Sequence, residues 1–87
     1  MDLYKSVGYA IRNIRLEKDL SQIIVSTRSG TNHSYYCEIE RGAANPTLKK
    51  LYAIIQALGI SFSEFVDAVS LVEEEGFSDP GPETASE

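Results

Sequence analysis

The chain has 87 residues, of which 43% are hydrophobic, with one cysteine and a formal net charge of −5. A chain of this size forms a single core that buries only about 60 to 65% of its unfolded surface, so a dimer interface would add useful stability. The single cysteine excludes an internal disulfide, and the sequence contains neither an apolar run of about 18 residues nor a secretion signal, so we expect a cytoplasmic domain without a membrane segment.

The first predicted helix runs from about Leu3 to Lys18. Its apolar residues recur at the i, i+3, i+4 and i+7 spacing of a buried helix face. These residues are Val7, Ala10, Ile11 and Ile14. The basic side chains Arg12, Arg15 and Lys18 lie off this stripe.

Residues 20–42 read LSQIIVSTRSGTNHSYYCEIERG and have the spacing of two short helices joined by a tight turn. The first helix is expected from Gln22 to about Arg28, because the Ser21 hydroxyl can cap its free backbone N–H groups. Gly30 suits the sharp reversal that follows, where a residue with a Cβ atom would be strained. The spacing therefore predicts a helix-turn-helix.

The second helix of this pair is expected from about His33 to Glu40, with Asn32 as its cap. Tyr36 and Ile39 share one face. The other face carries His33, Ser34, Cys37 and Glu38. A short helix with a polar outer face fits the major groove of DNA.

Two further helices are expected after residue 46. Thr47 caps the fourth helix, and Gly59 ends it. Its apolar face consists of Leu48, Leu51, Ile54, Ile55 and Leu58. Ser61 and Glu64 form a capping-box pattern that begins the fifth helix. This helix has more apolar surface than an isolated terminal helix tolerates in water, which predicts a partner for it.

Acidic residues are concentrated at the C-terminal end of the sequence. Residues 73–87 contain six acidic and no basic residues, which leaves seven acidic against eight basic residues in 1–72. Residues 76–87 lack periodicity and are rich in Pro, Gly, Ser and acid. We therefore expect a domain over 1–75, which is weakly basic before residue 73, and an acidic, disordered tail over 76–87.

Several of these motifs together resemble the Cro and phage-repressor (Xre) family of helix-turn-helix regulators. The matching segments are Leu20-Ser21-Gln22, Ser29-Gly30, Ser34-Tyr35, Ile39-Glu40-Arg41-Gly42 and Asn45-Pro46-Thr47. The resemblance covers roughly residues 5–66. It implies an all-α, compact five-helix lambda-repressor-like fold with the helix-turn-helix at its second and third helices.

The resemblance also implies a function. It indicates a sequence-specific transcriptional regulator that binds double-stranded DNA at a palindromic operator, and whose partners could include RNA polymerase. Among subgroups, the size and the segment RNIRLEKDLSQ are most similar to the short controller proteins of restriction-modification systems. Such a protein would be a homodimer joined through the fifth helix. The expected interface residues are Phe62, Phe65, Val66 and Val69.

The residues expected to contact DNA come from the helix-turn-helix and the loop after it. They are Gln22, Asn32, His33, Ser34, Tyr35, Cys37, Arg41, Asn45 and Thr47. His33 and Ser34 are expected to read bases, with Cys37 as a further candidate. Gln22 is expected to touch the DNA backbone and to brace the recognition helix. Lys49 and Lys50 could add phosphate contacts.

Alternatives remain open for three of these residues. Tyr35 could be a half-buried ring that stabilises its helix. Arg41 could pair with Glu40 instead of clamping a phosphate. Cys37 could be a redox-sensing thiol. A zinc site is not expected, because the sequence has one histidine and one cysteine and a tetrahedral site needs more ligands.

Three positions depart from the family pattern. Ile23 and Ile24 stand where acidic or polar residues are usual, and we expect them to pack on the first helix or on the C-terminal helix, with a protein-contact patch as the alternative. Thr31 replaces a frequent apolar residue, which should weaken the core between the helices. Asp19 replaces a glycine at the end of the first helix, at some cost in stability.

A second class of function competes with DNA binding. The same fold could serve as a protein-interaction module, such as an antitoxin or adaptor, and the low basic charge and Ile23-Ile24 favour this alternative. A prophage repressor is a further possibility. No catalytic arrangement is found, so we expect neither an enzyme nor a cofactor.

Overall fold

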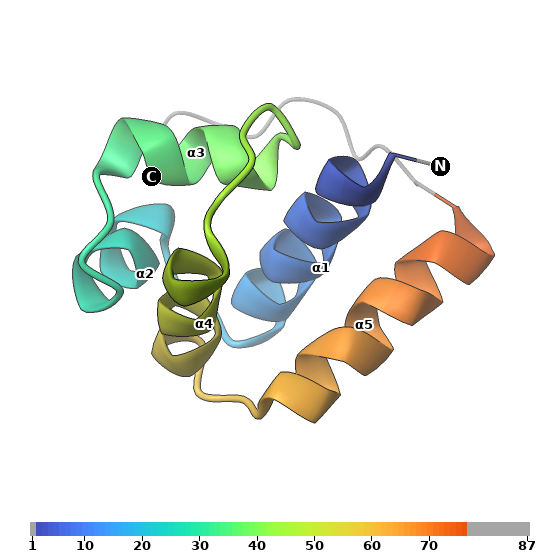
Figure 1. Cartoon of the computed structure of the whole chain (residues 1–87). Coiled ribbons are helices and arrows are strands. Elements are labelled where there is room, and N and C mark those ends of the chain that lie inside the picture. The colour runs from blue at the N-terminus through green and yellow to red at the C-terminus, as the bar shows by residue number, and fades with distance from the viewer. Residues whose placement is uncertain (1, 77–87) are drawn as a thin grey trace.

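Five α-helices make up the chain in the computed structural model, which describes residues 2–76 (Figure 1). Their bounds are α1 Leu3–Glu17, α2 Gln22–Arg28, α3 His33–Glu40, α4 Leu48–Ala57 and α5 Phe62–Glu75. This part of the chain contains no strand, which confirms the expected all-α fold. The predicted tail lies outside the described residues except for Gly76.

A polar N-cap residue precedes each of the five helices. Each accepts a hydrogen bond from a backbone N–H of the first turn, which satisfies a donor that the helix leaves free. The capping residues are Asp2, Ser21, Asn32, Thr47 and Ser61. At α5, the Glu64 carboxylate also accepts from the Ser61 backbone N–H at 2.8 Å, and this bond lowers the pKa of Glu64. The predicted capping box is thus confirmed.

The core lies between α1 and the other helices. Helices α1 and α5 lie side by side and run in opposite directions, while α2 and α3 occupy the far end of the molecule (Figure 1). Buried apolar residues from all five helices meet there. They are Ala10, Ile11, Ile14, Val25, Tyr36, Ile39, Ile54, Ile55, Phe65 and Val72, with Leu58 at the end of α4.

Part of the predicted apolar faces lies outside this core. Leu48, the first residue of α4 and part of its expected apolar face, is 71% exposed. On α5, Phe62 and Val66 are also exposed, whereas Phe65 is buried. Phe65 therefore packs within its own chain, and in this conformation it is not available to a second one.

Two positive φ angles shape the connections around α2. Gly30 has φ +67° in the turn between α2 and α3, as the motif predicts. Asp19 has φ +57° after α1, so an aspartate adopts the left-handed conformation that glycine adopts most easily. The expected backbone strain at Asp19 is thus present.

A glycine in the middle of α1 allows α1 and α3 to approach each other closely. Gly8 is buried against the end of α3, and a Cβ atom at this position would lie 2.6 Å from the Ile39 carbonyl oxygen and nearer still to that of Glu40. Glycine is unfavourable inside a helix. Its presence here is explained by the close contact with α3, which the sequence pattern alone did not indicate.

No single helix within residues 2–76 is long and apolar enough to cross a membrane, although α4 and α5, bent by 99°, together have the length and apolar content of a broken span.

Candidate nucleic-acid interface

The outer face of α3 is polar and partly or fully open to solvent. Ser34, Glu38 and Arg41 are exposed, and His33 and Cys37 are half-buried. On the opposite face, Tyr36 and Ile39 are buried in the core. The two faces of this helix thus divide as the sequence predicts, and the polar one is turned toward solvent.

A buried ion pair joins the C-terminal end of α3 to α1. Arg15 Nε donates to Glu40 Oε2 at 2.7 Å, and both side chains are almost inaccessible to solvent. The Tyr36 hydroxyl donates to the same carboxylate oxygen at 2.5 Å. Burial first, and then the charge of Glu40, raise the pKa of Tyr36, so its phenol stays protonated and remains a donor.

This ion pair differs from two expectations drawn from the sequence. Glu40 is occupied by Arg15, so the structure does not support a pair between Glu40 and the exposed Arg41. Arg15 was grouped with the basic side chains off the apolar stripe, yet only 1% of it is exposed. A charged side chain next to Ile14 gives no local signal of burial, because its partner lies 25 residues further along the chain.

Gln22 continues the network from Glu40 toward the outer face of α3. Its Nε2 donates to Glu40 Oε1 at 3.1 Å, and its Oε1 accepts from the Cys37 thiol at 3.3 Å. His33 Nε2 lies 3.7 Å from the same sulfur. The amide of Gln22 thus bridges α2 and α3, as expected for a residue that braces the recognition helix.

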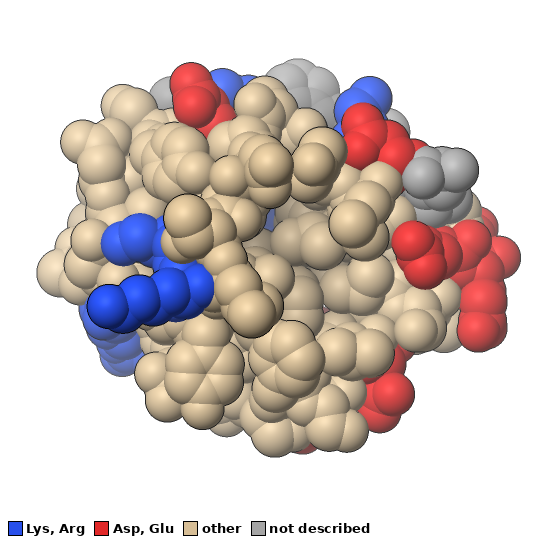
Figure 2. Space-filling model, in the orientation of Figure 1, with Lys and Arg blue, Asp and Glu red and all other residues tan. Residues whose placement is uncertain are grey.

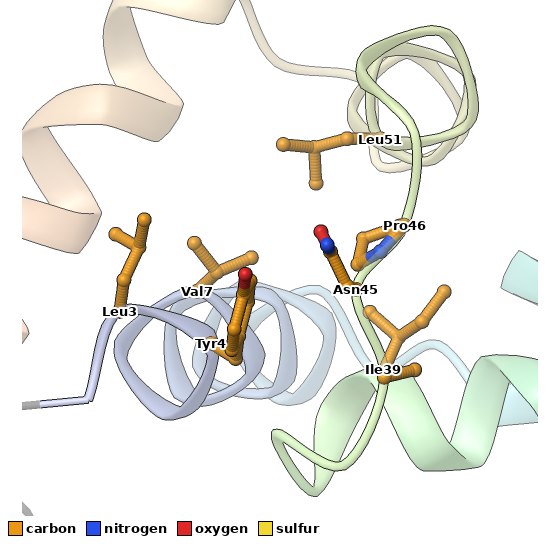
Figure 3. Close-up of a pocket in the computed structure, with 8 residues that line it drawn as sticks. Leu3, Tyr4, Val7, Ile39, Asn45, Pro46 and Leu51 are labelled. Carbon is orange, nitrogen blue, oxygen red and sulfur yellow. The ribbon is translucent and has the colours of Figure 1, made fainter.

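The residues on either side of α3 are mainly helix caps. Asn32 Oδ1 accepts from the Tyr35 backbone N–H at 3.1 Å, and Thr47 Oγ1 accepts from that of Lys50 at 3.1 Å. Asn45 is exposed, and its side chain points into a shallow apolar hollow of about 130 Å³ between α1 and α4 (Figure 3). The Tyr35 ring is half-buried and packs against the core.

Figure 2 shows a cluster of basic side chains and a cluster of acidic side chains on opposite sides of the face in view, with smaller basic and acidic groups next to one another along its upper edge. Lysine and arginine gather on the side of α2 and α4, and acidic residues gather on the end of α5 (Figure 2). Exposed basic residues include Arg28 at the end of α2, Arg41 at the end of α3 and Lys49 in α4. Lys50 Nζ donates to the Gly30 carbonyl at 3.0 Å, which ties α4 to the turn of the motif. The basic cluster on the side of α2 and α4 would attract a polyanion more strongly than the acidic end of α5.

Three residues in and after α2 differ from the family pattern, and the structure shows where their side chains lie. Ile23 and Ile24 are 45% and 40% exposed, so the prediction that they pack on a neighbouring helix is wrong. Thr31 is buried, and its hydroxyl lies 2.8 Å from that of Ser29, so this polar group has a hydrogen-bond partner.

A metal site is not formed at α3. Within residues 2–76, no group of three or more His, Cys, Asp and Glu side chains could hold a metal ion. The arrangement is instead a rigid polar helix, held from behind by a buried network and flanked by basic side chains. Such an arrangement can insert into a groove of DNA and contact phosphates beside it.

Comparison with known proteins identifies the family. The family described as Helix-turn-helix matches residues 11–65. The chain belongs to this family. An uncharacterized HTH-type transcriptional regulator of Sinorhizobium fredii, y4dJ, is 46% identical over 66 residues, which cover 76% of this chain and 86% of that protein. The helix-turn-helix chain is thus of the Xre/Cro type that its motifs indicate.

A second relative of this helix-turn-helix protein comes from a phage. The immunity repressor protein of Bacillus phage phi105 is 39% identical over 70 residues. The match covers 80% of this chain but only 49% of the repressor, so the chain spans about half the length of that relative.

Solved structures of a controller protein have the same fold. The wild-type restriction-modification controller protein C.Esp1396I superposes with a TM-score of 0.82 at 29% identity, covering 87% of this chain and 99% of that one. A tetramer of C.Esp1396I in complex with its natural 35 base-pair operator gives a TM-score of 0.77 at 31% identity, with coverage of 82% and 93%. These matches place the helix-turn-helix chain among small regulators.

Proposed function

We propose that this protein is a sequence-specific transcriptional regulator that binds a palindromic operator as a homodimer in the cytoplasm. The observation that carries the proposal is the polar outer face of α3, held on the core by the buried Arg15–Glu40 pair and bridged to α2 by Gln22. A recognition helix must keep its orientation while it lies in the major groove, and a fixed network behind it supplies that orientation. This function acts by binding and needs no catalytic group.

Roles for the site residues follow from their positions. Ser34 and His33 stand at the start of α3 and would read base edges, with Cys37 one turn further on. Reading by His33 requires its ring to turn away from the Cys37 sulfur, 3.7 Å from Nε2 in the free chain. Arg41 would contact a phosphate. Tyr35 would contact one through its hydroxyl while its ring stays packed on the core.

The remaining candidates lie around α3, and their roles differ with the contacts that their side chains already make. The amide of Gln22 is engaged inside the protein, so its role is chiefly to position α3. Asn32 and Thr47 begin helices, whose backbone N–H groups favour an anion. Asn45 would have to turn out of the hollow to reach a phosphate.

The dimer would form through apolar side chains of α4 and α5. We define the α4–α5 patch as Leu48, Tyr52, Phe62 and Val66, which are 45 to 71% exposed. The Tyr52 and Phe62 rings join the two helices, with centroids 6.4 Å apart. Such a group of exposed apolar residues is typical of an interaction surface. Val69 is half-buried beside it.

Control of a restriction-modification system is the specific role that the likeness to C.Esp1396I supports, with RNA polymerase as a possible further partner. A phage immunity repressor is the second candidate, supported by the relative from phage phi105. The neighbouring genes distinguish the two: a nuclease and methyltransferase pair supports the controller, and phage genes support the repressor.

The first experiment is selection of bound sequences from a random duplex pool at two salt concentrations, with the solution mass of the protein measured alongside. We expect an enriched palindrome bound by a dimer, with affinity that falls steeply as salt rises. Failure to enrich any sequence, with absent or salt-insensitive binding, would instead favour a protein-interaction module.

A further inference from the structure

A groove lies along the line where α1 packs against α5. Its volume is about 230 Å³, and the apolar residues that line it include Ala10, Ala68, Leu71 and Val72. Leu71 is 53% exposed, although α5 packs on the core. Leu71 and Phe62 are about two and a half turns apart, so their side chains lie on opposite sides of α5. The groove therefore stays open in a dimer joined through the α4–α5 patch.

The groove carries a carboxylate at each end. Glu17 ends α1 and Glu75 ends α5, and both residues line the groove. Because the two helices run in opposite directions, these glutamates lie at its opposite ends (Figure 1). Two more glutamates precede Glu75 in the last turn of α5, which contains no basic residue, and the C-terminal end of a helix is itself negative. The ammonium group of Lys18 lies beside Gly59, in the connection between α4 and α5.

This negative charge excludes several occupants. Phosphates of DNA would be repelled by it. A second copy of the chain, in a two-fold contact, would bring Glu17 and Glu75 against the same residues of the first copy. Residues 77–87 of this chain contain three acidic and no basic residues, so their charge has the same sign as that of the groove. The chemistry that fits is a segment of another protein with apolar and basic side chains.

We propose that the α1–α5 groove binds a helical segment of another protein, with aliphatic side chains against the apolar lining and a lysine or arginine at each end. A groove between two packed helices accepts the apolar face of a third helix. Along α1, the lining extends from Tyr9 to Glu17, which is about 12 Å of helix rise. Two basic residues roughly seven positions apart on the bound helix would span a similar length. This contact goes beyond DNA binding, because it would hold a second protein on the regulator.

The test uses the full chain and a synthetic peptide of about 12 residues, made of alanine with two leucines at i and i+4 and two lysines about two turns apart on the same face. Fluorescence anisotropy measures the Kd, and changes in the NMR amide shifts of the protein locate the contact. Wild type should bind the peptide saturably, with a Kd that rises with salt and with shift changes along α1 and α5. The measurement contains no DNA, so its failure would leave the proposed function unaffected.

Two variants of the groove have matched controls elsewhere on the surface. Leu71→Ser and Glu75→Lys should each raise the Kd about 5- to 10-fold, by removing apolar contact and by turning attraction into repulsion. Leu3→Ser changes another exposed leucine, and Glu38→Lys makes the same charge change on α3. Each control should alter the Kd by less than about 2-fold, since an exposed charge outside the groove is largely screened at physiological salt. All four positions are exposed, so the fold should survive, which a thermal melt verifies.

Several outcomes would overturn the proposal. A peptide with serines in place of its leucines that binds as tightly would show attraction by charge alone. Equal losses from Glu38→Lys and Glu75→Lys would assign the effect to net charge, and shift changes confined to the α4–α5 patch would place the peptide there. A lower solution mass of Leu71→Ser would identify the groove as a contact between copies of this chain. Absence of saturable binding to wild type would remove the groove as a docking site for such a helix.

Discussion

Two residues at opposite ends of α3, His33 and Arg41, should respond differently to truncation. We expect Arg41→Ala to weaken binding about equally on all DNA sequences and to lower the salt slope by about 1, since it would remove one phosphate contact. His33→Ala should instead relax the preference at one position of each half-site, at a cost of about 1 to 3 kcal/mol.

Competition titrations with operator variants, at two salt concentrations, measure both effects. Glu38→Gln is a control on the same helix for the general consequence of changing an exposed polar residue of α3. Equal losses on every sequence from both alanine variants would contradict the division between base-reading and phosphate-binding residues.

Glu40 should matter far more for stability than a glutamate two positions away. Glu40→Gln leaves the Arg15 guanidinium buried without its counter-charge, and removing one partner of a buried pair costs about 3 to 5 kcal/mol. Glu38→Gln changes an exposed carboxylate and should shift the free energy of unfolding by less than about 0.5 kcal/mol. Urea denaturation of both variants measures the difference. Similar stabilities would show that Arg15 finds another partner when Glu40 is neutral.

At the scale of single elements, the contact between α1 and α3 makes a prediction that opposes helix propensity. Alanine is about 1 kcal/mol better than glycine inside a helix, so Gly8→Ala would stabilise an isolated α1. In the folded chain, however, the new methyl group would lie 2.6 Å from the Ile39 carbonyl oxygen. We expect Gly8→Ala to destabilise the protein, by about 1 to 3 kcal/mol, as overpacking usually does.

Gly30→Ala is the matched control, because a Cβ atom at Gly30 would meet no atom within 4 Å and only the backbone at φ +67° would be strained. That strain should cost about 1 to 2 kcal/mol without altering the packing of α1 on α3. Thermal unfolding reports both stabilities, and near-UV circular dichroism should change for Gly8→Ala alone. A Gly8→Ala variant more stable than wild type would show that the two helices can separate freely.

How far the sequence predicts each element depends on the range of the interactions involved. The bounds of α2 and α3 follow from Ser21, Gly30 and Asn32, because caps and turns act within a few residues. The close approach at Gly8 and the burial of Arg15 depend on residues more than 20 positions away. Periodicity reports only the local face of a helix, so neither feature was visible in it.

The same reasoning explains the outcome at α2 and at the candidate site. Which side chains of α3 face outward could be predicted, since they follow from helical spacing alone. The exposure of Ile23 and Ile24 could not, because an apolar pair on a short helix fits either a buried or an exposed position until the neighbouring helices are placed. The engagement of the Gln22 amide by Glu40 and Cys37 likewise depends on the tertiary fold.

At the scale of the whole molecule, two phenylalanines of α5 should have different roles, one in the folding of the chain and the other in the formation of the dimer. Among the expected interface residues, Phe65 is 3% exposed and belongs to the core, whereas Phe62 is 45% exposed and lies in the α4–α5 patch. A lysine at Phe65 should therefore unfold the chain, because an uncompensated buried charge is very costly. A lysine at Phe62 should leave the chain folded and yield monomers.

Monomers of the Phe62→Lys variant should bind the operator poorly, because each would contact one half-site and lose the gain from holding two recognition helices about 34 Å apart on one duplex. Sedimentation measures the mass, and titration of full and half operators measures the affinity. Glu74→Lys, at the other end of the same helix, is the control for adding a lysine to α5 and should stay dimeric. A Phe62→Lys protein with the mass of a dimer and full affinity would place the two-fold interface elsewhere.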